Sequence, residues 1–165
     1  MEKLKITLDV NDQLHEVMIL PQDTLLEVLR DQLDLTGSKE SCGEGICGSC
    51  TIQMDGKPVR SCLTLALEAQ GTKIKTVEGL AHGDELSDLQ QSFIDHGAVQ
   101  CGFCTPGMLM SADALLQDNS KPDEKDVKKA LSGNICRCTG YSKIIQAVSH
   151  AGNPEISCPD CKTDQ

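Results

Sequence analysis

The stretch "SCGEGICGSC", residues 41–50, carries three closely spaced cysteines, Cys42, Cys47 and Cys50. Their spacing is Cys-x4-Cys-x2-Cys, and Cys62 follows after eleven intervening residues. This is the plant-type pattern for a [2Fe–2S] cluster, in which four thiolates bind two irons bridged by two sulfides. The interleaved glycines let the backbone wrap tightly and turn its amides toward the sulfurs, which favours the reduced cluster. A zinc site is the alternative, but zinc usually takes two short Cys or His pairs.

Two further cysteine pairs lie in the second half of the chain, Cys101-x2-Cys104 in "QCGFCTPG" and Cys136-x-Cys138 in "NICRC". Each pair precedes a predicted helix, so a helical bundle can bring both pairs to one end. The spacing alone leaves zinc and a second [2Fe–2S] cluster open. A first cluster in the same chain favours the second, because neighbouring redox centres form a relay. Arg137 either offsets the negative charge of this cluster or faces a partner as a surface arginine.

Composition restricts the class of protein. The chain has 165 residues, enough for one ordinary domain or two small ones. Its ten cysteines are clustered, which in a reducing compartment indicates metal or redox chemistry rather than disulfides. A net charge of −10 argues against nucleic acid as a partner. We expect a cytoplasmic protein without a membrane partner, because the chain opens on a strand pattern and no apolar run reaches spanning length.

The first half of the sequence predicts a small α+β domain over residues 1–79. Polar and apolar residues alternate from residue 4 to residue 10, a strand pattern, and a second strand is expected over 14–20. A capped helix is expected over 25–33, and a hairpin over 51–61 around Asp55-Gly56. A short helix beginning at Cys62 and a last strand over 72–79 complete this half.

The second half predicts an all-α domain of about four helices over residues 84–151. Apolar residues recur at helical spacing in four segments, and Pro and Gly lie at their expected ends. These segments are 85–98, 106–118, 121–133 and 140–151. Residues 152–165 are expected to form a flexible tail, in which Cys158 and Cys161 are incidental or bind metal weakly.

No catalytic constellation is found in the sequence. The four histidines are dispersed, with none at ligand spacing to another, and structural roles are expected for all of them. The sequence contains no Ser-His-Asp arrangement, phosphate loop or dinucleotide-binding fingerprint. We therefore expect no catalytic residue in this chain and no binding of flavin or nicotinamide by this chain alone.

Three motifs, "SCGEGICGSC", "GAVQCGFCTPGM" and "SGNICRCTGY", resemble the signatures of the small iron–sulfur subunit of the molybdenum hydroxylases, the xanthine dehydrogenase, aldehyde oxidase and carbon monoxide dehydrogenase family. The similarity in order and layout covers residues 3–150. It implies a β-grasp ferredoxin-like domain followed by a four-helix domain, each with one [2Fe–2S] cluster. The ligands implied are Cys42, Cys47, Cys50 and Cys62 for the first cluster, and Cys101, Cys104, Cys136 and Cys138 for the second.

The resemblance also implies a place in a larger enzyme. A large subunit would hold a molybdopterin cofactor and hydroxylate an N-heterocycle or an aldehyde. Electrons would pass to the second cluster, then to the first, and on to an FAD-binding medium subunit. By the motif match, Gln100 and Cys138 would lie against the pterin, whereas Cys136 would be a plain ligand. The alternatives are a free-standing two-cluster electron carrier and a zinc-stabilised interaction module.

Overall fold

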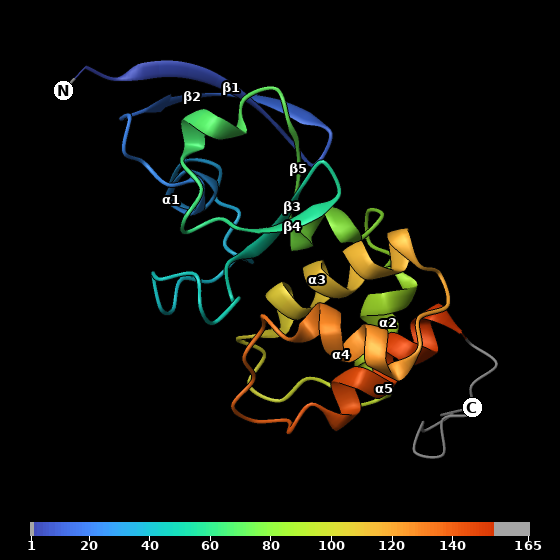
Figure 1. The fold of residues 1–165 in the computed structure, drawn as a ribbon. Helices are drawn as coiled ribbons and strands as arrows, with labels where there is room; N and C mark the ends of the chain where they lie inside the picture. Colours follow the sequence, from blue (N-terminus) through green and yellow to red (C-terminus); the bar gives the residue numbers. More distant parts are fainter. Residues whose placement is uncertain (1, 154–165) are drawn as a thin grey trace.

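The computed structural model describes residues 2–153 and divides into a sheet half and a helical half, each with its own buried core (Figure 1). Sheet and helices together confirm the α+β class. Within residues 2–153, no helix is both long enough and apolar enough to cross a membrane.

The sheet half is built on one five-stranded mixed sheet in the order β2-β1-β5-β3-β4. Its strands are β1 (Leu4–Val10), β2 (Gln13–Ile19), β3 (Thr51–Met54), β4 (Lys57–Arg60) and β5 (Lys73–Lys75). The β1–β5 pair is parallel, and the other neighbours are antiparallel. The central pairing of β5 with both β1 and β3 joins the two hairpins into one sheet.

Both predicted hairpins are present, and their turns have the expected chemistry. Asn11 and Asp12 have φ of 52° and 62°, and Asp55 and Gly56 have φ of 49° and 75°. Positive φ at both central residues is typical of the turns that match strand twist, and Asn, Asp and Gly tolerate it best.

The helix predicted over residues 25–33 begins as expected and then changes geometry. Thr24 and Glu27 form a reciprocal capping box at the start of α1 (Leu25–Glu27). The helix continues with π geometry over η1 (Val28–Gln32), and Leu25 and Leu29 are buried against the sheet.

The helix predicted to begin at Cys62 is wrong in position and type. Residues 61–63 form turns, and only η2 (Ala66–Ala69) is helical, as a 3-10 helix. The reason is tertiary, because Leu65 is held extended by a β-bridge to Thr24. Cys62 therefore lies on a turn beside β4.

In the part of the second half that the structure describes, up to residue 153, there are four α-helices: α2 (Asp88–Asp95), α3 (Thr105–Asp118), α4 (Glu124–Leu131) and α5 (Ser142–Gly152). Their common core contains Phe93 and several side chains of α3, α4 and α5. Leu80, at the end of η3 (Val77–Leu80), packs into this core as well. The segment η3, which links the sheet half to the helical half, is therefore packed against the helical core.

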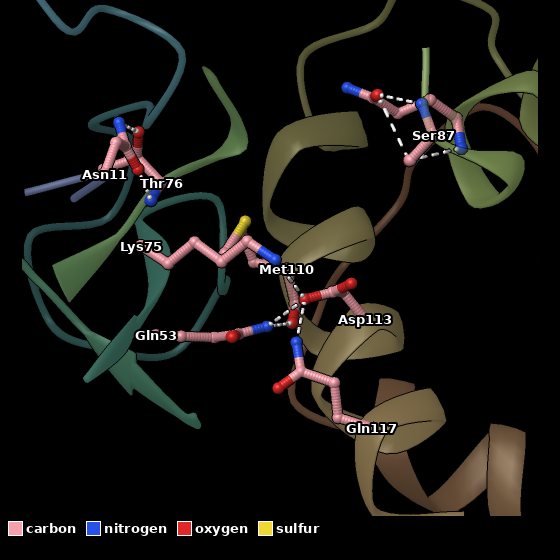
Figure 2. Close-up of polar contacts among 9 residues, drawn as sticks. Asn11, Gln53, Lys75, Thr76, Ser87, Met110, Asp113 and Gln117 are labelled. Carbon is pink, nitrogen blue, oxygen red and sulfur yellow. Dashed lines mark hydrogen bonds and ion pairs between the residues drawn. The ribbon is translucent and has the colours of Figure 1, made fainter. Parts of the chain in front are cut away.

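A buried polar contact fastens the two halves together. Figure 2 shows Gln53, on β3, reaching α3. Its Nε2 donates to the Met110 carbonyl oxygen at 3.0 Å and to the Asp113 carboxylate at 2.9 Å. The same carboxylate accepts from Gln117 at 2.6 Å and pairs with Lys75 at 3.3 Å. Because the Gln53 side chain is only 1% exposed, its amide depends on these acceptors.

Candidate metal centres

The first candidate centre gathers the cysteines of the opening stretch and the turn after β4. Cys42 and Cys47 come from the loop before β3, and Cys50 immediately precedes that strand. The Sγ atoms of Cys50 and Cys62 lie 3.2 Å apart. Cys42 Sγ accepts from the backbone amide of Cys47 at 3.5 Å. Antiparallel pairing of β3 with β4 brings Cys62 back to the loop.

The thiols of this centre lie in unlike environments. The backbone amides of Cys47 and Glu44 donate to Cys42 Sγ and lower its pKa to about 6. Burial raises the pKa of Cys62 to about 11, and the thiol of Cys50 adds to the effect. A sulfur that accepts N–H donors is stabilised in its anionic form, so this loop is suited to hold thiolates.

The glycines of the Cys42–Cys50 loop mainly allow its backbone conformation, and the N–H groups that donate to Cys42 come from other residues. Gly43, Gly45 and Gly48 have φ of 65°, 74° and 75°, a region that costs other residues strain. Among the glycines, the Gly45 backbone N–H partly offsets the rise in the pKa of Cys62 that burial causes. Cys42 instead receives the amides of Glu44 and Cys47.

The second candidate centre gathers both cysteine pairs of the helical half. Cys101 and Cys104 precede α3, and Cys136 and Cys138 lie in the loop between α4 and α5. Cys138 Sγ lies 3.6 Å from Cys101 Sγ. The Cys104 and Cys136 thiols form the other pair, and burial together with this neighbour raises the pKa of Cys104 to about 12. The two pairs thus converge at one end of the helices, as the sequence predicted.

Cys136 forms hydrogen bonds through its sulfur and its amide that the cysteine spacing did not predict. Thr139 donates to Cys136 Sγ from its hydroxyl at 3.1 Å and from its amide at 3.4 Å. Burial raises the pKa of this thiol, but hydrogen bonds from Thr139, from the Cys138 amide and from the Cys104 thiol together outweigh burial and hold the pKa below its usual range. Tyr141, with φ of 69°, accepts from the Cys136 amide at 2.9 Å and donates to the Asn134 carbonyl oxygen at 3.3 Å.

The grouping of the thiols fits a centre with two irons. At each centre the thiols associate as pairs, Cys50 with Cys62 and Cys101 with Cys138 at 3.2 Å and 3.6 Å. A [2Fe–2S] cluster needs two thiolates at each of two irons, whereas a structural zinc needs four ligands around one point.

The second centre has two exposed cysteines, and exposed apolar residues lie next to its cysteines in the sequence. Cys101 and Cys138 are exposed, as are Gln100 and Arg137. Val99, Phe103 and Ile135 are 40%, 45% and 50% exposed. Apolar side chains exposed together mark surfaces that partners cover. The first centre differs in its cysteines, because none of the four is exposed, although Ile46 and Leu63 beside them in sequence are exposed apolar residues.

Other predicted features lie away from these centres or outside the described residues. His96 closes α2, where it is buried with its Nδ1 2.8 Å from the Ser92 carbonyl oxygen, and its ring lies 5.0 Å from that of His150. Cys158 and Cys161 fall outside residues 2–153, so the prediction for the tail stays a prediction.

Comparisons with known proteins match two families along the chain. Residues 6–93 match a family described as "2Fe-2S iron-sulfur cluster binding domain", and residues 76–149 match one described as "[2Fe-2S] binding domain". These two ranges overlap at the link between the sheet half and the helical half.

Two named relatives and a solved structure match nearly the whole chain. The nicotine 6-hydroxylase small subunit of Paenarthrobacter nicotinovorans is 50% identical, over 91% of this chain and 90% of its own. The nicotinate dehydrogenase small FeS subunit of Eubacterium barkeri is 46% identical, over 92% and 96%. The crystal structure of quinoline 2-oxidoreductase from Pseudomonas putida 86 superimposes with a TM-score of 0.89 at 46% identity, covering 92% of this chain and 94% of that chain.

Proposed function

The chain belongs to the family of small [2Fe–2S] subunits of the molybdenum hydroxylases, and on this premise we propose which of its residues carry electrons and in which direction. It is an electron-transfer subunit of an oxidoreductase complex, with two [2Fe–2S] clusters as its cofactors and a large partner that carries the molybdopterin. The clusters supply one-electron redox chemistry when bound, and the protein supplies ligands, spacing and hydrogen bonds.

We propose two ligand sets, which the thiol pairs support. The first consists of Cys42, Cys47, Cys50 and Cys62 in the sheet half. The second consists of Cys101, Cys104, Cys136 and Cys138 in the helical half. We assign the two sets to two units, residues 1–79 with a β-grasp fold and residues 84–151 with a four-helix bundle.

The single observation that carries the direction of transfer is the exposure of the second centre. Cys101 and Cys138 are exposed, and so are three apolar residues that neighbour the cysteines of this centre in sequence, Val99, Phe103 and Ile135, which we call the apolar rim. A large subunit that covers this rim would exclude water and bring its pterin against Cys138. Gln100, exposed beside Cys101, has an amide with both donor and acceptor capacity for the polar edge of a pterin. Electrons would therefore enter at the second centre and leave through the first.

The names of the relatives support an N-heterocyclic substrate for the whole complex. Nicotine, nicotinate and quinoline are nitrogen heteroaromatics, and the proteins named for them match this chain along nearly its whole length. We propose that the partner large subunit hydroxylates a substrate of this class, rather than an aldehyde. The electrons would then pass to an FAD-binding medium subunit, and the complex would work in the cytoplasm.

Ligand replacement in the intact complex tests the two ligand sets. Cys50→Ser should remove the EPR signal of one reduced cluster and about half of the iron, while Cys136→Ser should remove the other signal and the other half. A Ser92→Ala variant, altered at a buried polar residue of α2, is the matched control and should keep both signals. Loss of the same signal in both cysteine variants would contradict the assignment.

Anaerobic reduction of the purified complex tests the substrate class. Mixing with nicotinate, quinoline or a purine should bleach the iron–sulfur absorbance within one turnover, whereas simple aldehydes should bleach it far more slowly. Preferential bleaching by aldehydes would refute the heterocycle proposal and leave the electron-transfer role intact.

A further inference from the structure

The loops of the two candidate centres meet at one point, where three glycines permit close backbone contact. Gly48 lies between Cys47 and Cys50, Gly107 lies in the first turn of α3, and Gly133 precedes the Cys136 loop. A Cβ on Gly107 would collide with the Gly48 carbonyl oxygen. A Cβ on Gly48 would collide with the Gly133 carbonyl oxygen and approach the backbone of the next residue. The absence of side chains here allows one backbone to lie on another.

Asn134 and Arg60 hold these backbones together. The Asn134 side chain, 3% exposed, donates to the Gly48 carbonyl oxygen at 3.0 Å and accepts from Ser111, on α3, at 2.8 Å. Arg60, at the end of β4, donates to the Gly133 carbonyl oxygen at 2.6 Å and to the Gly45 carbonyl oxygen at 3.3 Å. Each side chain therefore bridges the loop of the first centre to the helical half.

A backbone hydrogen bond completes the junction. The Ile135 amide donates to the carbonyl oxygen of Cys47 at 2.8 Å. Ile135 directly precedes Cys136, so one residue of each proposed ligand set is joined to the other through a single hydrogen bond and the adjoining backbone. A shift of either loop would stretch this bond.

We propose that Gly107, Asn134 and Arg60 are positioning residues that set the separation of the two clusters and so the rate of electron transfer between them. The inference rests on the ligand sets proposed above. In the step concerned, one electron leaves the second cluster, which is oxidised, and reduces the first, with no bond made or broken. Electron transfer falls steeply with distance, so a small displacement of the loops slows it.

Gly107→Ala is the sharpest test. Alanine is the best helix former, so the substitution suits α3 itself, but its methyl group must push the Gly48 loop away. Gly152→Ala is the matched control, because Gly152 is also helical and its added Cβ would be equally crowded, with Pro122 and Leu116 at 2.8 Å and 2.9 Å. None of the atoms that this Cβ would meet belongs to a loop of either centre. Arg60→Lys is the second variant, because it keeps the charge but loses the rigid fork that spans two carbonyls.

The measurement is made on the purified complex with both clusters reduced. EPR gives the splitting from the magnetic coupling between the clusters, which depends on their separation, and flash reduction gives the rate of inter-cluster transfer. We expect Gly107→Ala and Arg60→Lys to keep both cluster signals with smaller splitting and slower transfer, and Gly152→Ala to match the wild type.

Each other outcome has a distinct meaning. Wild-type splitting and rate in both variants, with both clusters present, would overturn the proposal. Loss of a cluster from both variants would also overturn it, since the junction would then serve assembly rather than spacing. Absence of two cluster signals in the unsubstituted complex would refute the ligand sets themselves, a separate result.

Discussion

Replacing Thr139 with valine should lower the reduction potential of the second cluster. The Thr139 hydroxyl donates to Cys136 Sγ at 3.1 Å, alongside the amide of the same residue at 3.4 Å. Valine keeps the branched shape and the amide, so the change removes the hydroxyl donor and little of the packing. A donor to a cluster sulfur stabilises the reduced, more negative state, and its loss favours the oxidised state.

The size of the shift follows from the energy of one charge-assisted hydrogen bond, about 1.5–3 kcal/mol. Only the part that differs between the two oxidation states moves the potential. If that part is about a third, it amounts to about 0.5–1 kcal/mol. For one electron, about 1.4 kcal/mol corresponds to 59 mV, so we expect a fall of about 20–45 mV.

A redox titration followed by EPR on the intact complex measures this shift for each cluster separately. Thr139→Ser, which keeps the hydroxyl, is the control and should lie near the wild type. The Thr139 hydroxyl also accepts from the Tyr141 amide at 3.2 Å, so the thermal midpoint of each variant should be recorded. An unchanged second-cluster potential in a fully iron-loaded Thr139→Val protein, or an equal fall in Thr139→Ser, would refute the reasoning.

Three further predictions concern the junction, the surface and the tail. Asp113→Ala removes an acceptor of the buried Gln53 amide and should lower the free energy of unfolding by about 1–3 kcal/mol. Its control is Asp118→Ala, at an exposed position of the same helix, which should change the free energy of unfolding by less than about 0.5 kcal/mol. Equal shifts of the thermal midpoint in the two variants would contradict this prediction. Arg137→Ala should lower the second-cluster potential because it removes a nearby cation, and Arg137→Lys should restore it; an unchanged titration would leave Arg137 as a partner-facing side chain. The double variant C158A/C161A should keep full iron content and turnover, and loss of iron would give the tail cysteines a metal-binding role.

Local features of this chain were predictable from its sequence because they depend on neighbours a few residues away. The hairpins at Asn11-Asp12 and Asp55-Gly56 follow from turn chemistry. The capped start of the helix after Thr24 was expected, because its capping box lies within four residues. The caps at Ser87 and Asp123 are equally local, although the sequence pattern predicted these two helices from residues 85 and 121. The spacing of Cys42, Cys47 and Cys50 indicated iron–sulfur chemistry for the same reason, since a cluster loop is a local structure, whereas the spacing of the two later pairs left zinc open.

The tertiary structure decided what depends on residues far apart in the chain. The helix predicted at Cys62 is absent because Thr24 holds Leu65 extended. No sequence signal pairs Gln53 with Asp113, or Arg60 with the Gly133 carbonyl oxygen, because such contacts exist only once the sheet and α3 have packed. The cysteine spacings, and the family resemblance that rests on them, therefore led to the two proposed sets of four thiols, whereas only packing decided which loops touch. The reason is physical. The spacing of cysteines along the chain limits the geometry of one loop, whereas the distance between the two centres depends on the interface between the sheet half and the helical half.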